Sequence, residues 1–389
     1  MNFQKVEAYL SALPETYGLT GVDCKIMKNH QTLFRKSVGF RDTAHTKPVS
    51  DRDLYDVYSC TKIITMVAAM QCVERGLFCL DDPVEQYLPG FSDMAVADNF
   101  NSGFPPVMPK SSDPMHPAAG KITIRHLMSM TSGMSYDLES EAIREIIAKN
   151  PHADTLALAA AMGRMPLLFE PGTHYFYSLG HDVVAAVVEV VTGMRYRDYL
   201  QQNIFNPLGL KDMFLHIPES EKWRVTAKYS FDPDTQRILP HDGSNDYRLT
   251  DCYDSGGAGL CCTVDDYILI LDALACGGVA HNGYRLLTQD SIDQLRAPQL
   301  DDTCREDFLL GGKVGYSYGL GVRTLVEAEK SRSPVGEFGW DGAAGAYAVI
   351  DPVNHISIFY TQEVLDMLRC YQEIHPTLRD LIYEAIEHD

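Results

Sequence analysis

Positive charge is scarce in this sequence, and long apolar runs are missing. Lys and Arg total 33 against 53 Asp and Glu, which gives a formal charge of -20 at pH 7. Such an excess repels phosphate backbones and anionic lipid, so we expect neither nucleic acid nor membrane as a partner. No stretch approaches the roughly 18 apolar residues of a membrane span. Residues 1–7 lack the basic and apolar regions of a signal peptide, so we expect a cytoplasmic location.

Metal-binding patterns are also missing. The ten cysteines include no Cys-x-x-Cys pair, and several lie within apolar runs. This pattern is typical of reduced, buried thiols in the cytoplasm. His126, His174, His181 and Asp182 show no ligand spacing with a third partner within reach, so we interpret them as structural or surface residues. We expect no metal and no other cofactor.

The apolar residues present are numerous enough for a large core. The chain has 389 residues, of which 45% are hydrophobic, enough for two packed domains or one large one. Spacing and turn residues predict helices, hairpins and loops along most of the chain. Helices are predicted at residues 3–12, 61–75, 141–148, 155–162, 182–191, 265–276 and 365–386, the last broken or kinked near Pro376. Hairpins are predicted at residues 21–40 and 346–361, and a long loop at residues 99–121.

One short motif carries the strongest chemical signal. Ser59 and Lys62 form the only Ser-x-x-Lys in the chain, at the start of an apolar helical run. Positions three apart share one helix face, so the hydroxyl and the amine can share a hydrogen bond. The helix N-terminus and desolvation both disfavour a charged lysine. The motif predicts a serine nucleophile with a lysine base, although taken alone it is also typical of a helix cap followed by a surface lysine.

Further motifs follow in a recognisable order. Residues 54–90 closely resemble the first motif region of the serine β-lactamase and penicillin-binding-protein superfamily, in its class C-like branch. Other segments of the chain resemble later landmarks of that branch. They are residues 122–133, 175–180, 206–210 and 255–260. The resemblance extends over most of the chain, from about residue 20 to about residue 360.

The resemblance assigns roles to individual residues. It implies that Ser59 is the acylated nucleophile, Lys62 its base and Tyr177 the second proton carrier. Tyr177 precedes Ser178, a good N-cap for the helix that follows, so the phenol is expected at a fixed helix start. A neighbouring ammonium would stabilise a phenolate there. Taken alone, Tyr177 could instead be an aromatic staple; Tyr175 and His174 are the nearest competitors for its role.

The third motif departs from the β-lactamase pattern. Residues 338–345 align with Lys-Thr-Gly, but Trp340 replaces the cation. This substitution resembles the family VIII-type esterases, where Trp-Gly-Gly occupies the position. The resemblance implies an oxyanion hole made by the N–H groups of Ser59 and Ala343, and a strand kept open by Gly342 and other small residues. Trp340 could equally pack in the core. Asp341 replaces the usual glycine, with an orientation that the sequence leaves open.

The implied fold is α/β (α+β) and β-lactamase-like, a central antiparallel sheet flanked by helices plus an inserted, mainly helical domain. We expect residues 1–75 and 255–389 to form the α/β domain and residues 76–254 the helical domain, with the site at their junction. Strand-like signals return after Trp223, but the sequence predicts no reliable element within residues 223–254, which together with the loop at 99–121 are expected to shape the pocket.

The most favoured function is a serine hydrolase that works through an acyl-enzyme. The absence of a motif-three cation, and Leu179 in place of an amide donor, favour a carboxylesterase acting on small uncharged esters or amides. Alternatives are a β-lactamase or D-amino-acid peptidase, an acyltransferase of the same fold, and a catalytically inactive binding protein. The partner is expected to be a small ester or amide, and the oligomeric state stays open.

Overall fold

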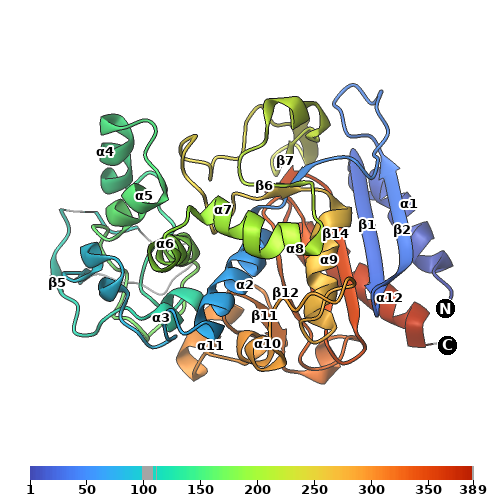
Figure 1. Ribbon diagram of the computed structural model, residues 1–389. Coiled ribbons are helices and arrows are strands. Elements are labelled where there is room, and N and C mark those ends of the chain that lie inside the picture. Colours follow the sequence, from blue (N-terminus) through green and yellow to red (C-terminus); the bar gives the residue numbers. More distant parts are fainter. Residues whose placement is uncertain (99–107, 111, 388–389) are drawn as a thin grey trace.

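An antiparallel sheet of seven strands organises the protein. Figure 1 shows the computed structural model, which describes residues 1–98, 108–110 and 112–387. The strand order is β10-β11-β12-β13-β14-β1-β2, and every neighbouring pair is antiparallel. The strands are β1 (Gly21–Lys28), β2 (Gln31–Gly39), β10 (Tyr316–Tyr318), β11 (Arg323–Leu325), β12 (Phe338–Asp341), β13 (Tyr347–Asp351) and β14 (Ile356–Thr361). Both chain ends contribute to this sheet, as the sequence predicts.

Helices cover both faces of the sheet (Figure 1). On β14, Ile356 and Ile358 belong to the core shared with α1 (Gln4–Tyr17) and α12 (His375–Glu387). Phe359 points to the opposite face, where it stacks on Tyr267 of α9 (Val264–Ala275) at 4.2 Å between ring centres. Alternation along the strand therefore buries both of its faces, which is why β14 is apolar almost throughout.

The helical part packs against α2 (Thr61–Glu74), the helix that follows Ser59. Its centre is α6 (Gly180–Thr192), which contacts α2, α3 and α5. The remaining helices are α3 (Ile124–Met128), α4 (Glu141–Lys149), α5 (Thr155–Met162), α7 (Tyr196–Leu200), α8 (Asn206–Leu208), α10 (Gln289–Arg296) and α11 (Asp302–Leu309). Ile64 of α2 and Val184 of α6 belong to one continuous core, so the two predicted parts of the chain share their interior.

Short strands complete the structure. They are β3 (Tyr55–Asp56), β4 (Ala95–Ala97), β5 (Met115–Pro117), β6 (Met213–Phe214), β7 (Tyr229–Asp232), β8 (Arg237–Pro240), β9 (Cys261–Cys262) and β15 (Val364–Leu365). Strands β7 and β8 form a hairpin after Trp223, where the sequence shows strand-like signals, and β15 joins them in a small sheet. The fold class predicted from the sequence is confirmed, whereas the exact domain boundaries stay a prediction.

Most predicted elements are confirmed, with differences at their ends. The first helix runs on to Tyr17, because Leu13 is buried beyond the predicted end. The loop predicted at residues 99–121 lies partly outside the described residues, and its 115–117 part is strand β5, paired with β4. The helix predicted at residues 365–386 is wrong at its start. Val364 and Leu365 are strand, and Asp366, at φ 60°, has a left-handed backbone conformation incompatible with a helix there.

The helix that follows β15 begins later. A π-helical turn, Cys370–Ile374, leads directly into α12, and Pro376 lies in the first turn of α12. Pro376 has no N–H group to donate to the preceding turn. The π-helical turn directly before it is the helix irregularity that the sequence predicts near this residue.

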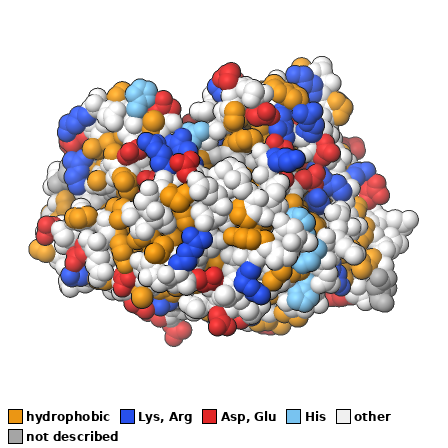
Figure 2. All heavy atoms as spheres, viewed as in Figure 1, with side chains coloured by type: hydrophobic (Ala, Val, Ile, Leu, Met, Phe, Trp, Pro, Cys, Tyr) orange, Lys and Arg blue, Asp and Glu red, His pale blue; other side chains and the backbone are white. Residues whose placement is uncertain are grey.

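The surface agrees with the charge balance. Figure 2 shows Lys and Arg side chains interspersed with Asp and Glu over the face in view, without one large basic patch on it. Across the described residues, no helix combines the length and apolar character needed to cross a bilayer.

Candidate active site

Ser59 lies in a tight turn before α2. The turn is a single 3-10 helix, Tyr58–Cys60, and Tyr58 has a positive φ of 43°. A left-handed conformation is costly for a tyrosine, so surrounding bonds must hold it. Tyr267 donates a hydrogen bond to the Cys60 carbonyl at 2.8 Å, and the Thr61 hydroxyl accepts one from the Leu260 N–H at 3.0 Å. The turn therefore presents a partly exposed Ser59 on a rigid base.

Lys62 is fully buried beside Ser59. Its ammonium nitrogen lies 3.4 Å from Ser59 Oγ, 3.5 Å from the Tyr136 hydroxyl and 2.8 Å from the Gly257 carbonyl. Burial lowers the pKa of Lys62 to about 7, although the Asp182 carboxylate acts in the opposite direction. A large fraction of Lys62 is therefore neutral near pH 7, which leaves a lone pair for the serine proton.

Tyr177 approaches the same group from the segment before α6. The Lys62 nitrogen lies 4.5 Å from the centre of its ring, and Tyr136 stacks on the ring at 5.5 Å. Trp340 donates a hydrogen bond from Nε1 to the Tyr177 hydroxyl at 3.0 Å. The structure thus brings Ser59, Lys62 and Tyr177 together, while the role of each stays a prediction.

Two expectations are wrong here: the phenolate at Tyr177 and the N-cap at Ser178. Burial raises the pKa of Tyr177 far above its ordinary value, although hydrogen bonds with Ser59 and Trp340 oppose the rise. The resting form is therefore a neutral phenol, not a phenolate. The N-cap of α6 is Leu179, one residue after Ser178. The Ser178 hydroxyl accepts a hydrogen bond from the Gly180 N–H at 3.2 Å.

Tyr175 and His174, the alternatives to Tyr177 as second proton carrier, make their contacts outside the pocket around Ser59. Tyr175 packs edge-on against Phe308 and Tyr318. His174 pairs with Asp307 at 2.9 Å. Neither Tyr175 nor His174 lines the pocket around Ser59.

The third motif lies at the end of β12, beside Ser59. The Cα of Gly342 is so close to the backbone just before the Tyr58–Cys60 turn that a Cβ there would lie 2.4 Å from the Val57 carbonyl oxygen. Only glycine permits this approach. The Tyr371 hydroxyl shares its single proton between the carbonyls of Gly342 (2.9 Å) and Ala343 (2.8 Å). These contacts fix the backbone of Gly342 and Ala343 in the pocket that Ser59 lines.

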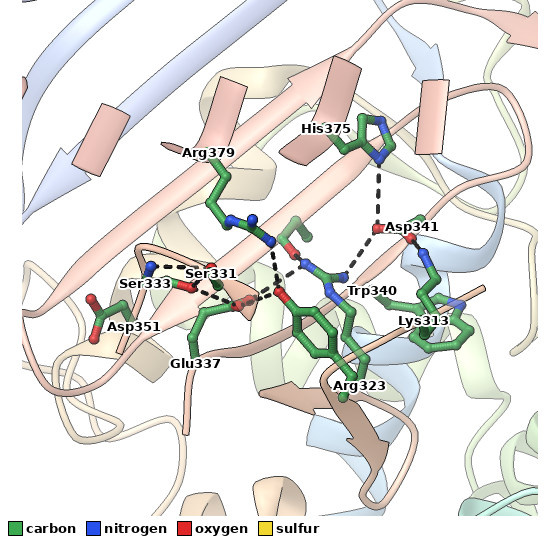
Figure 3. A network of polar contacts seen from close by, with 12 residues as sticks. Lys313, Arg323, Ser331, Ser333, Glu337, Trp340, Asp341, Asp351, His375 and Arg379 are labelled. Carbon is green, nitrogen blue, oxygen red and sulfur yellow. Dashed lines mark hydrogen bonds and ion pairs between the residues drawn. The ribbon is translucent and has the colours of Figure 1, made fainter. Parts of the chain in front are cut away.

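Asp341 points away from Trp340, as alternation along β12 requires. Figure 3 shows Lys313, Arg323 and His375 directed toward its carboxylate. Arg323 Nη1 lies 3.1 Å from Asp341 Oδ1, and Lys313 pairs with Oδ2. Burial alone raises the pKa of Asp341, but Lys313 and Arg323 outweigh it and hold that pKa below its usual range. Asp341 is therefore an ionised partner in a salt-bridge network.

Burial lowers the pKa of His375 to about 3, so its neutral ring adds no positive charge to the network.

A cavity of about 370 Å³ opens over Ser59. Five aromatic side chains line it: Tyr136, Tyr177, Tyr247, Trp340 and Tyr371. Lys313, from the loop after α11, also lines it. Trp340 stands at the position of the motif-three cation, as the sequence indicates, but a segment outside the third motif brings a cation, Lys313, into the pocket.

Sequence reasoning missed several residues of the site. Tyr136 follows the Thr-Ser-Gly landmark by three residues, a position that could have drawn attention to it. Asp182 was interpreted as structural, yet it is buried and acts on the charge of Lys62. Lys313 had no local signal, because only the fold brings it to Asp341.

Two groups of possible metal ligands occur in the described part of the chain. They are His30, Asp272 and Cys276, and His152, Asp251 and Cys252. Neither group contains a residue that lines the pocket around Ser59.

A sheet covered by helices, with a serine, a lysine and a tyrosine meeting at the edge of a helical region, defines the serine β-lactamase and penicillin-binding-protein superfamily. The chain belongs to its Beta-lactamase family, whose model matches residues 6–367. The family resemblance inferred from the sequence motifs is thereby confirmed.

Relatives in this family are named as acyl-transferring or ester-cleaving enzymes. Acyltransferase mokF of Monascus pilosus is 32% identical over 281 residues, which cover 70% of this chain and 64% of that protein. Lovastatin esterase of Penicillium rubens is 30% identical over 269 residues, covering 68% and 64%. The structure of EstCE1, described as a hydrolase with promiscuous acyltransferase activity, matches with a TM-score of 0.78 at 21% identity, covering 98% of each chain. The two sequence relatives support an enzyme of the serine hydrolase type, and the likeness to EstCE1 supports the fold.

Proposed function

We propose that the protein is a carboxylesterase that forms an acyl-enzyme at Ser59. The observation that carries the proposal is a buried Lys62, with its pKa lowered to about 7, within 3.4 Å of Ser59 Oγ. A neutral amine at this position can take the serine proton near neutral pH.

In the first step, Ser59 Oγ attacks the ester carbonyl and Lys62 accepts the hydroxyl proton. The N–H groups of Ser59 and Ala343 stabilise the oxyanion. Tyr177 donates its phenolic proton to the departing alkoxide, and the Lys62 ammonium returns a proton to Tyr177. Water then attacks the acyl-enzyme and Lys62 accepts its proton. Lys62 passes this proton to Ser59 Oγ as the acyl–oxygen bond breaks, which releases the acid and restores the serine hydroxyl and the neutral lysine.

Trp340 has two parts in this proposal. Its Nε1–H holds the Tyr177 hydroxyl, and its ring forms a wall of the pocket. An apolar acyl group can rest on that ring. The atoms around the scissile bond therefore meet aromatic surface, which supports an uncharged ester or amide at the reacting end; the sequence-based expectation is a substrate that is small and uncharged as a whole.

β-Lactam hydrolysis or D-amino-acid peptidase activity has less support. Leu179 is buried at the position where the β-lactamase pattern has an amide donor, and Trp340 replaces the cation on the strand. A β-lactam amide would therefore lack its donor, and a β-lactam carboxylate would lack a cation on the strand, because Lys313 lies 5.9 Å from the centre of the Trp340 ring instead. An inactive binding protein is also disfavoured, because Ser59, Lys62 and Tyr177 lie together with a lysine near neutrality.

An acyltransferase is the second candidate. It requires only that an alcohol replace water in the second step. The relatives named as acyltransferases support this possibility. The cytoplasmic location stays a prediction from the sequence, and so does the absence of a cofactor.

Covalent labelling tests the proposal. Wild type and Ser59→Ala are incubated with a fluorophosphonate and weighed by intact-protein mass spectrometry, while 4-nitrophenyl esters of graded chain length and nitrocefin are assayed in parallel. We expect a Ser59-dependent adduct with ester turnover and little nitrocefin cleavage. Ester turnover that survives in Ser59→Ala contradicts the proposal. Adding a short alcohol to the ester assay distinguishes transfer from hydrolysis, because only transfer yields a new ester.

A further inference from the structure

A second cavity adjoins the pocket over Ser59. It measures about 250 Å³ and lies on the opposite face of the sheet, between β11, β13 and α12. Lys313, Asp341 and Tyr371 line both cavities. The two spaces therefore meet at the end of β12, where Lys313 is in reach of both.

The second cavity is basic although the chain is acidic. Its wall carries one carboxylate, Asp341, and four cationic side chains: Lys313, Arg323, Lys330 and Arg379. The whole chain has a formal charge of -20. A cluster of this sign attracts anions against the field of the rest of the molecule.

Most of these cations are already paired. Arg323 is buried and donates to Asp341, Glu337 and the Ala348 carbonyl. Arg379 is buried and donates to Asp380 and to the Tyr316 hydroxyl. Arg323 therefore holds Asp341 in place, while Arg379 is engaged by Asp380 and Tyr316.

Lys313 differs from the two arginines. Its side chain is 23% exposed, and its partner in the ion pairs of the described residues is Asp341. An ammonium group has three donors, so pairing with one carboxylate leaves capacity for another acceptor. Lys313 is thus the cation that a ligand in the pocket can reach.

The position of Lys313 sets where a bound anion would lie. Its nitrogen is 5.9 Å from the ring centre of Trp340 and 5.5 Å from that of Tyr371. The Trp340 indole nitrogen contacts the Tyr177 hydroxyl at 3.0 Å. The indole therefore stands between the reacting atoms and Lys313, and a ligand that touches both must extend along that ring.

We infer that the preferred substrate has an apolar acyl chain ending in an anionic group, a carboxylate or a phosphate, which Lys313 binds. The inference rests on the proposed esterase reaction at Ser59. The ester lies at Ser59, the methylene chain rests on Trp340, and the anion reaches the basic cavity. The substrate is then uncharged at the scissile bond and charged at its far end.

Substitutions at Lys313 and at Asp341 should change the preference for anionic esters in opposite directions. Its carboxylate competes with the substrate anion for Lys313. Lys313→Met removes the cation and weakens the preference for anionic esters, whereas Asp341→Asn releases the cation and strengthens it. If the Lys313–Asp341 pair were merely structural, both substitutions would break the same contact and change activity in the same direction.

The kinetic test compares mono-4-nitrophenyl esters of dicarboxylic acids with their methyl-capped, neutral partners at each chain length. The measured quantity is the ratio of kcat/KM for the acid to kcat/KM for its methyl ester, so each preparation is its own reference. We expect a ratio of at least about ten in the wild type at one optimal chain length, close to one in Lys313→Met, and higher in Asp341→Asn. Lys121→Met, which removes an exposed lysine outside both cavities, is the control for net charge.

A wild-type ratio near one, or a change of the same sign in Lys313→Met and Asp341→Asn, overturns the inference. Esters ending in a phosphonate, run beside the carboxylates, determine which anion is preferred. If no ester is turned over, the proposed function fails, and binding tests the cavity separately. Titration of adipate and of inorganic phosphate into Ser59→Ala should show binding of at least one that is about tenfold weaker in Ser59→Ala/Lys313→Met, and equal affinity for the two proteins overturns the inference.

Discussion

The charge of Asp182 offers a sharp test of Lys62 as the base. Asp182 Oδ1 accepts hydrogen bonds from Tyr253 (2.6 Å), Ser255 (2.7 Å) and the Gly257 N–H (3.1 Å). Its Oδ2 has no hydrogen-bond partner in the part of the chain that the structure describes. Asp182→Asn keeps an oxygen for the three donors and removes the negative charge. The perturbation is therefore electrostatic, with nearly unchanged shape.

Its magnitude follows from the short path between the two groups. The Gly257 N–H binds Asp182 while the Gly257 carbonyl binds Lys62, so the charges lie at most about 9 Å apart. At an effective dielectric constant of about 20, they attract by roughly 2 kcal/mol. This corresponds to a little more than one pH unit. Because Asp182 raises the pKa of Lys62, its removal should lower that pKa from about 7 toward roughly 6.

The assay is the pH dependence of kcat/KM, which reports groups of the free enzyme. Hydrolysis of a 4-nitrophenyl ester is followed at the wavelength where the phenol and its anion absorb equally. The wild type should gain activity as pH rises through about 7, and Asp182→Asn should gain it about one unit lower. Asp351→Asn, which changes a buried carboxylate on β13, should leave the midpoint in place. An unchanged or raised midpoint in Asp182→Asn would refute Lys62 as the titrating base.

Three further substitutions test separate parts of the structure. Tyr177→Phe should lower kcat by about 10² to 10⁴ with little change in KM, because the leaving group loses its proton donor; steady-state kinetics measures both. Gly342→Ala should destabilise the fold by about 1–3 kcal/mol, since its Cβ would meet the Val57 carbonyl at 2.4 Å; thermal unfolding shows this. Lys62 has a folded pKa of about 7 against an ordinary value of 10.5, so between these values the unfolded chain binds more protons and wild-type stability rises with pH. Lys62→Met should flatten that rise in urea titrations at several pH values.

The parts of the fold that sequence could predict are those determined by local spacing. The hairpin of β1 and β2 and the helices α5, α6 and α9 follow from alternation and helical periodicity. Ser59 and Lys62 are three residues apart, so their contact is also local. The start of the last helix was missed because Val364 pairs with Tyr229, more than a hundred residues earlier, and no local pattern reports such a pairing.

The charges around Lys62 and Asp341 also depend on residues that are distant in the sequence and are brought together only by the fold. Asp182 acts on Lys62 through Gly257, and Lys313 reaches Asp341 from a loop outside the third motif. The replacement of a motif lysine by Trp340 therefore removes a cation from one backbone position, not from the pocket. That position alone would predict a neutral pocket, whereas Lys313 and Asp341 form an ion pair in it. Under the inference above, a substrate anion competes with Asp341 for Lys313.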